Sequence, residues 1–208
     1  MIFESIAVGP LEVNCSIVGC EQSREGIVVD PGGNVEKIAA IVTRHRLKIH
    51  TIINTHGHFD HLGGNRQALT TFSGARLLIH QADAPMLSKS AEVARMYGIP
   101  GDNSPEADAY LVDGMEVIFG TCRLKVLYTP GHTLGGCCLY FEDEHKVITG
   151  DTLFADSIGR TDLPGGSHEQ LLNSIRTKLF TLPDDVIAYP GHGPETTIGH
   201  EKRCNPYF

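Results

Sequence analysis

Thr55-His56-Gly57-His58-Phe59-Asp60-His61 follows directly after an apolar run, residues 49–53, whose pattern predicts a buried strand. The segment brings three imidazoles and a carboxylate close together in the sequence. Burying so many titratable groups costs free energy unless another charge compensates them. Neutral imidazole and carboxylate are good ligands for zinc and its first-row neighbours, so the segment predicts a divalent metal site.

The order of the ligand types in this segment predicts two ions. Gly57 permits a sharp turn, so His56 and His58 can converge on one ion. Asp60 is in position to cap the N-terminus of the next helix. From that position, Asp60 and His61 would point away from the ion that His56 and His58 bind. Four ligands divided two and two indicate a pair of ions.

Composition is that of an ordinary globular protein: 208 residues, 41 % hydrophobic and 20 % charged. We expect a single domain over residues 1–208. The formal net charge of -8 argues against a nucleic-acid partner. No apolar run is long enough to span a bilayer, and the N-terminus lacks a secretory signal, so we expect a cytoplasmic protein without a membrane partner.

The six cysteines form no Cys-x-x-Cys pair, and we expect them to be reduced thiols: Cys15, Cys20, Cys122, Cys137, Cys138 and Cys204. Cys137 and Cys138 are adjacent in a predicted strand. Alternation along that strand predicts that they point to opposite faces.

Apolar runs that end in turn residues predict the strands. They are residues 5–8, 14–18, 26–29, 48–53, 76–79, 115–119, 123–128, 137–141, 146–149 and 186–189. Helical spacing predicts a helix capped by Asn34 and a second from Leu62 to about Phe72. A capping box at Ser167 starts a third helix, which runs to about Leu179.

The overall arrangement follows from these elements. Strands followed by a helix in each half predict two related units stacked sheet against sheet, with helices outside. Residues 88–108 are rich in Pro, Gly and acidic residues and predict an exposed loop with a helical turn near 91–97. Such a loop either covers an active site or is a surface excursion.

Three later strands end in a Gly- or Pro-bearing turn that presents one polar residue: His132, Asp151 or His192. Because strand ends gather at one edge of a sheet, we expect these residues to meet the histidine segment there. The predicted ligands are His56, His58 and His132 for one ion and Asp60, His61 and His192 for the other, with Asp151 bridging them. Each ion keeps an open position for water, as catalytic metal sites do.

With a His-x-His-x-Asp-His motif followed by separate His, Asp and His residues, the chain resembles the metallo-β-lactamase superfamily over its whole length. Within it, the chain is most similar to short glyoxalase II-like (hydroxyacylglutathione hydrolase-like) proteins, on residues 149–154, 157–166 and 201–207. The resemblance implies an α+β fold, the four-layer αββα sandwich, with two mixed sheets flanked by helices. It also implies a binuclear site with the ligands given above.

The implied activity is that of a metal-dependent hydrolase, in which a hydroxide at the binuclear site cleaves a small-molecule thioester similar to S-lactoylglutathione. We expect two Zn²⁺ ions, with iron or manganese as alternatives. Asp60 and Asp151 are the expected catalytic residues, because they would hold the hydroxide. Full-length glyoxalase II carries a C-terminal helical domain that supplies much of its glutathione-binding surface. The sequence ends at Phe208, so we expect that domain to be absent.

Substrate recognition and the reaction itself leave alternatives open. Arg160, or Lys202 and Arg203, is expected to meet a substrate carboxylate. The other interpretation of Arg160 is structural, through a contact with Asp162 in its own Gly-rich loop. A persulfide dioxygenase with one iron is the alternative activity, and a lactonase is a further one. Metal content separates the hydrolase, with two metal ions, from the dioxygenase, with one iron.

Overall fold

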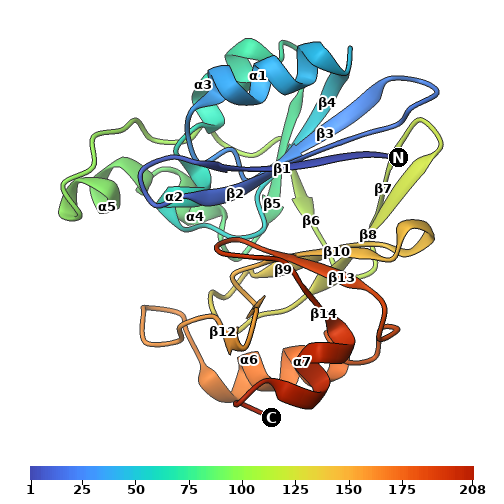
Figure 1. Cartoon of the computed structure of the whole chain (residues 1–208). Coiled ribbons are helices and arrows are strands. Elements are labelled where there is room, and N and C mark those ends of the chain that lie inside the picture. The colour runs from blue at the N-terminus through green and yellow to red at the C-terminus, as the bar shows by residue number, and fades with distance from the viewer.

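Two six-stranded sheets pack face to face in the computed structural model, which describes residues 1–208 (Figure 1). The strands of the first sheet lie in chain order: β1 (Ile2–Val8), β2 (Val13–Gly19), β3 (Glu25–Val29), β4 (Lys48–Ile53), β5 (Arg76–His80) and β6 (Ala109–Leu111). Strands β1 to β3 are antiparallel and β3 to β6 are parallel, so the sheet is mixed.

The second sheet has the strand order β14-β13-β10-β9-β8-β7. Its strands are β7 (Glu116–Phe119), β8 (Cys122–Tyr128), β9 (Cys137–Phe141), β10 (Lys146–Gly150), β13 (Ile187–Pro190) and β14 (Thr196–Thr197). This sheet is also mixed, because β10 and β13 are parallel while the other neighbours are antiparallel. A short hairpin, β11 (Leu153–Phe154) and β12 (Ser157–Ile158), follows β10.

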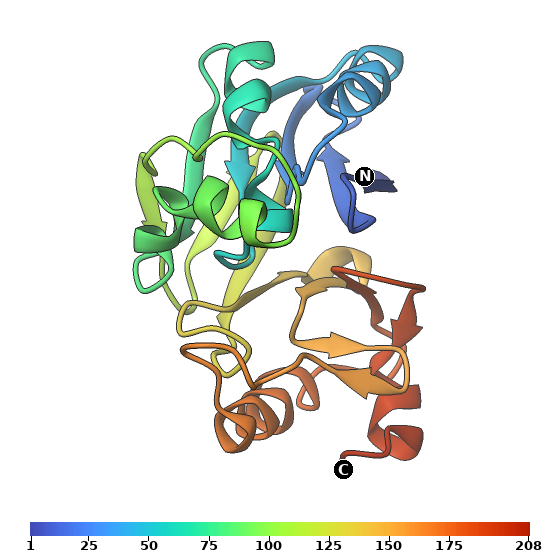
Figure 2. The same ribbon diagram turned by 90° about the vertical axis from the view of Figure 1, so that its left-hand side faces the viewer.

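Helices cover the outer faces of both sheets (Figures 1 and 2). In the first half they are α1 (Val35–Arg44), α2 (Phe59–Leu62), α3 (Asn65–Thr71), α4 (Ala84–Leu87) and α5 (Ser90–Met96). The second half has α6 (His168–Ser174), which continues as a π-helix over Ile175–Leu179, and α7 (Ile198–Cys204). None of these helices has both the length and the apolar character needed to cross a membrane.

Three buried clusters separate the four layers. The strand alternation places Val28 under α1, whereas its neighbours Ile27 and Val29 face the second sheet. Cys137 lies between the two sheets and Cys138 packs against α6, so the prediction that they point to opposite faces is confirmed. The predicted αββα sandwich is therefore the observed architecture.

All of the predicted strands are present. The sequence analysis missed several other elements: α4, α7, β6, β14 and the β11–β12 hairpin. Helix α5 lies inside the predicted loop, at the place where a helical turn was expected. Ser167 accepts a hydrogen bond from the Gln170 amide, as its capping box predicts.

The helix after the histidine segment differs from the prediction. It begins at Phe59 rather than Leu62, with His58 at the N-cap position, so Asp60 lies in its first turn and does not cap it. It is also divided into α2 and α3 at Gly63 and Gly64. A Cβ at Gly64 would collide with the Pro31 carbonyl oxygen, which accepts a hydrogen bond from the Gly64 amide. This close approach of a distant turn interrupts the helix.

The cap predicted for α1 also differs in its bonding. Asn34 does occupy the N-cap position, but its side chain accepts no capping hydrogen bond from the helix backbone. Its Oδ1 instead accepts the Gly9 amide at 2.9 Å. Asn34 therefore ties the β1–β2 turn to the start of α1.

Candidate metal centre

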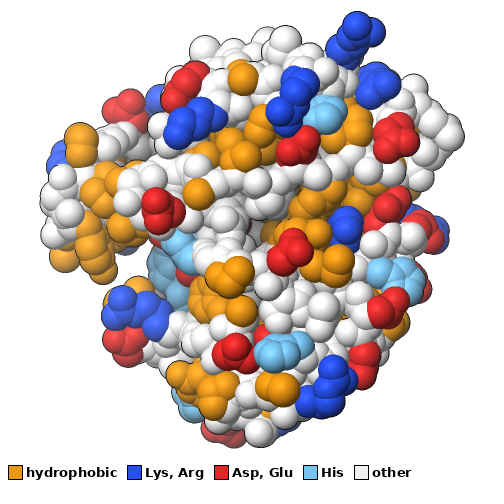
Figure 3. All heavy atoms as spheres, viewed as in Figure 1, with side chains coloured by type: hydrophobic (Ala, Val, Ile, Leu, Met, Phe, Trp, Pro, Cys, Tyr) orange, Lys and Arg blue, Asp and Glu red, His pale blue; other side chains and the backbone are white.

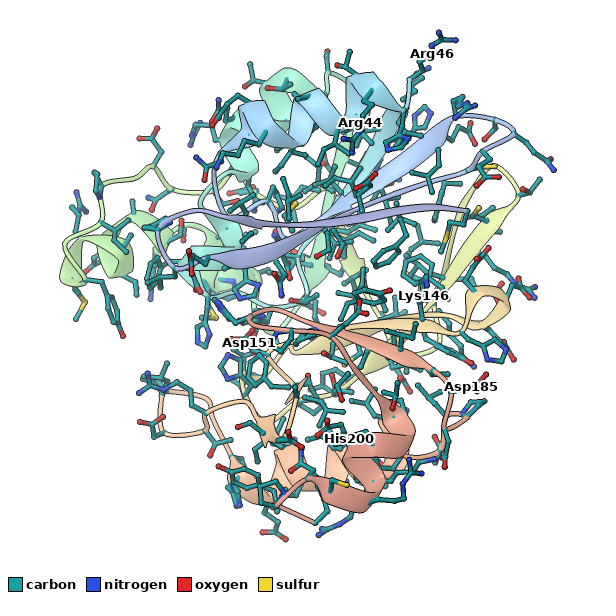
Figure 4. The ribbon with its side chains drawn as sticks, in the orientation of Figure 1. Arg44, Arg46, Lys146, Asp151, Asp185 and His200 are labelled. Carbon is teal, nitrogen blue, oxygen red and sulfur yellow. The ribbon has the colours of Figure 1, made fainter.

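The seven predicted ligands lie together at one edge of the sandwich. The segment after β4 carries four of them, and the turns after β8, β10 and β13 carry His132, Asp151 and His192. Figure 4 shows Asp151 at the end of β10, where the two halves of the chain face each other. The turn before His132 requires glycine, because a Cβ at Gly131 would collide with the backbone of Leu171.

His56, His58 and His132 form the first cluster. The Nδ1 atom of His58 lies 3.1 Å from His56 Nε2 and 2.8 Å from His132 Nε2. His132 donates from Nδ1 to the Arg160 carbonyl oxygen at 2.7 Å, so its neutral form carries a lone pair at Nε2. Ring nitrogens that converge in this way suit a shared cation.

Burial keeps His56 and His58 of the first cluster uncharged. It holds the pKa of His56 well below the usual histidine value, and the neighbouring imidazoles add to the effect. Burial, followed by the proximity of His132, lowers the pKa of His58 to about 4. Both rings are therefore neutral at pH 7 and have lone pairs available for a metal ion.

Asp60, His61 and His192 form the second cluster. Asp60 Oδ2 lies 3.2 Å from His192 Nε2 and 3.8 Å from His61 Nε2. In each cluster the ligand atoms all lie within 4.8 Å of one another. The two clusters thus have the dimensions of two neighbouring ion sites.

Asp151 lies between the two clusters. Its Oδ2 is 3.5 Å from His132 Nε2 and 3.9 Å from His192 Nε2, and its Oδ1 is 3.4 Å from His61 Nε2. A carboxylate in this position can serve both ions at once.

Two buried atoms indicate that the residues present fit metal ions. His61 Nε2 and Asp151 Oδ1 have no hydrogen-bond partner, although buried polar atoms are normally paired. Burial opposes a charge on His61, yet the carboxylates of Asp151 and Asp30 raise its pKa well above the usual value. The site therefore favours positive charge at this point, and a divalent cation would supply it while satisfying both atoms.

The sequence analysis missed Asp30, which holds the candidate ligand His61 and the nearby Thr55 in place. Its Oδ2 accepts hydrogen bonds from His61 Nδ1 at 3.0 Å and from the Thr55 hydroxyl at 2.6 Å, and its Oδ1 accepts the Thr55 amide. Donation from Nδ1 leaves His61 Nε2 free to bind an ion. Asp30 follows a predicted strand and precedes Pro31 and Gly32, so its position at a strand end was a signal available in the sequence.

Asp83 was also missed, and it joins the two ligand-bearing loops. It is 1 % exposed. Its Oδ2 accepts the Gly57 amide at 2.9 Å and the Thr133 hydroxyl at 2.7 Å, and its Oδ1 accepts the Gly135 amide at 2.7 Å. No motif in the sequence marks this residue.

Arg160 lines the cleft beside the clusters, but its guanidinium group is already engaged. Its Nε and one terminal nitrogen donate to the two carboxylate oxygens of Asp162, at 2.8 and 2.9 Å. This contact is the structural alternative stated for Arg160. The backbone of the same residue positions His132.

Lys202 and Arg203 do not line this cleft. Both lie on α7, where Lys202 contacts Asp184 at 2.7 Å and Arg203 contacts it at 3.3 Å. In Figure 4, His200 of the same helix lies apart from Asp151 at the end of β10. Both basic side chains already pair with Asp184, and their contact with a substrate carboxylate stays a prediction.

The cleft at the two clusters has a volume of about 400 Å³. Its floor consists of ligand-type side chains, and its walls include Leu11, Phe59, Val93, Tyr97 and Leu163. Tyr97 stacks on Phe59 with ring centroids 5.1 Å apart. Hydrophobic side chains gather on the projecting segment at the left of Figure 3, which contains α5. The predicted loop therefore borders the cleft.

Metal analysis gives the first prediction. Protein loaded with zinc and freed of excess ion is expected to hold two ions per chain, measured by elemental analysis. Ions that bind only the folded state stabilise it by about 4 kcal/mol at a free concentration 1,000 times the Kd, so chelation should lower the melting temperature. Absence of bound transition metal, with a melting temperature unchanged by chelator, would contradict the assignment.

Comparisons with known proteins agree with this geometry. The family model described as the metallo-beta-lactamase superfamily matches residues 8–192. The hydroxyacylglutathione hydrolase GloC of Haemophilus influenzae is 36 % identical over 100 % of this chain and 98 % of its own length.

Solved structures share the whole fold. The structure described as the B3 metallo-beta-lactamase BLEG-1 superimposes with a TM-score of 0.92, at 36 % identity over 99 % of both chains. TTHA1623 in a di-iron-bound form has a TM-score of 0.90, at 34 % identity over 99 % of this chain and 100 % of its own.

Proposed function

Because the chain belongs to the metallo-beta-lactamase superfamily, we propose that it is a metallo-hydrolase that cleaves a thioester similar to S-lactoylglutathione. The observation that carries the proposal is the convergence of two histidine-rich clusters and a shared carboxylate on one cleft. The full-length similarity to a protein named hydroxyacylglutathione hydrolase supports the choice of substrate class.

His56, His58 and His132 would hold one divalent ion, Asp60, His61 and His192 the other, and Asp151 would contact both. Bound divalent ions of this kind lower the pKa of a water from about 15.7 to about 7 and polarise a carbonyl oxygen. We propose zinc, and the di-iron form of TTHA1623 keeps iron in consideration.

The chain's own residues orient the reactants. Asp60 and Asp151 both line the cleft, so their carboxylate oxygens can accept hydrogen bonds from the attacking water and direct its lone pair toward the substrate. The apolar walls offer a contact surface for the apolar part of a thioester. A thiol leaving group has a pKa of about 8.5, so it departs as a thiolate without a general acid.

The test replaces His58, one of the three histidines of the first cluster, by alanine. We expect His58→Ala to lower kcat/KM for S-lactoylglutathione on the order of 10²-fold or more, because a first ion would lose one of three ligands. His145→Ala is the matched control, since His145 pairs with the exposed Asp185 away from the cleft. A folded His58→Ala protein that is as active as the parent would overturn the proposed mechanism.

A substrate panel separates the candidate reactions. It comprises a thioester, a lactone, a persulfide and a β-lactam, the last because of the similarity to BLEG-1. Anaerobic thioester cleavage with two ions per chain supports the hydrolase. One iron per chain with oxygen uptake on the persulfide would instead identify a dioxygenase. The proposal includes a small-molecule substrate, no nucleic-acid partner and a cytoplasmic location, which fits the six free cysteines.

A further inference from the structure

Cys20 and Cys122 come from different sheets and meet in one surface pocket. Cys20 follows β2 of the first sheet, and Cys122 is the first residue of β8 in the second. Both line a pocket of about 140 Å³, which shares no residue with the cleft at the metal centre. Cys20 is 1 % exposed and Cys122 is half-buried, so this pocket is the route by which a small reagent would reach the two sulfur atoms.

Two neighbouring turns hold the Cys20 sulfur in place. The Ser23 amide donates to Sγ at 3.5 Å, and the Thr121 hydroxyl lies 3.3 Å from the same atom. The contact between the turns is close, because a Cβ at Gly120 would collide with the side chain of Cys20. Hydrogen bonds to Ser23, followed by those to Thr121, lower the pKa of Cys20 to about 5.

The pKa of the second thiol, Cys122, is shifted in the opposite direction from that of Cys20. Burial raises the pKa of Cys122 to about 11, and the charge and hydrogen bonding of the nearby Cys20 sulfur contribute. The pocket thus combines one thiolate with one protonated thiol, which is the combination that disulfide formation uses.

The other four cysteines lack this arrangement. Cys15, Cys137 and Cys138 are buried and do not line this pocket, and burial raises the pKa of each thiol. Cys204 is exposed, on α7 at the opposite end of the chain, and provides a natural control for non-specific oxidation.

We propose that Cys20 and Cys122 form a peroxide-reactive dithiol that is oxidised to an intramolecular disulfide. The Cys20 thiolate attacks one oxygen of hydrogen peroxide, the O–O bond breaks, and the departing hydroxide takes up a proton to become water. Cys20 is then a sulfenic acid. The Cys122 thiol attacks that sulfur, the S–O bond breaks, a second water leaves and the S–S bond forms. Peroxide accepts the two electrons that the two sulfurs lose.

The experiment treats the zinc-loaded full chain with a small excess of hydrogen peroxide, quenches it with catalase and alkylates the remaining thiols. Intact mass and non-reducing peptide mapping are expected to show the loss of two hydrogen atoms and a Cys20–Cys122 peptide. The melting temperature should rise, because the new bond closes a long loop between the two sheets, and should return to its starting value with reductant.

Single variants test the order of the steps. Cys122→Ser should stop at Cys20 sulfenic acid, which a dimedone-type probe traps, whereas Cys20→Ser should form neither product. Cys204→Ser should behave like the parent. Oxidation confined to Cys204, or trapping of Cys20 sulfenic acid in the parent without a disulfide, would overturn the proposal. Either result can be obtained whether or not the protein hydrolyses a thioester.

Discussion

Replacing Asp151 by asparagine is expected to lower kcat/KM for the proposed thioester on the order of 10³-fold. The two side chains have nearly the same shape, so the fold should persist while the charge is lost. In the parent, burial opposes ionisation of Asp151, but the charge of the neighbouring His61 holds its pKa well below the usual carboxyl value. Asp151 is therefore ionised at neutral pH and is the carboxylate that both ions would share.

Metal content distinguishes this explanation from a loss of fold. We expect Asp151→Asn to retain less than the parent's two ions after dialysis, while circular dichroism remains unchanged. Asp185→Asn is the matched control, because Asp185 lies at the opposite end of the second sheet (Figure 4), is exposed and forms an ion pair with His145. Full metal content together with parental activity in Asp151→Asn would exclude Asp151 from the bridging position.

The convergence of the candidate ligands was predictable because each one stands next to a strong local signal. His132, Asp151 and His192 each follow an apolar strand and a turn containing glycine. A strand end restricts where its next residue can lie, so the strand order of the sheet brings these positions to one edge. The same reasoning would have found Asp30, which also follows a strand and precedes a Pro-Gly turn.

The predictions that failed depend on contacts between distant segments. The division between α2 and α3 results from the approach of Gly64 to Pro31, which no local pattern shows. Lys202 and Arg203, near the C-terminus, were expected to meet a substrate carboxylate. Helix α7 instead places both against Asp184. The position of a residue along the chain does not by itself show which distant residues its side chain contacts.

The role of Asp83 depends entirely on contacts with residues that are distant in the sequence. Its three hydrogen-bond donors come from residues 57, 133 and 135, which belong to the two loops that carry His58 and His132. Asp83 itself precedes the short α4, which the sequence analysis missed. A single buried carboxylate thus determines how the first cluster's loops meet, before any ion binds.

Asp83→Ala is therefore expected to lower the free energy of unfolding of the metal-free protein by about 3 kcal/mol, because it leaves buried amide donors without an acceptor. Urea unfolding measures this difference. Metal affinity should also fall by about 10–100-fold, as it does when residues that orient ligands are removed.

Asp143→Ala is the control, since an exposed carboxylate of this kind should change stability by less than about 0.5 kcal/mol. Asp83→Asn should be intermediate, because its amide keeps one acceptor oxygen and loses the other. If Asp83→Ala unfolded at the parental urea concentration and bound metal as tightly as the parent, the two loops would have to be held by other contacts. The bond from His132 to the Arg160 carbonyl oxygen is one such contact. The three hydrogen bonds that Asp83 accepts instead predict that its replacement weakens the connection between the loops that carry His58 and His132.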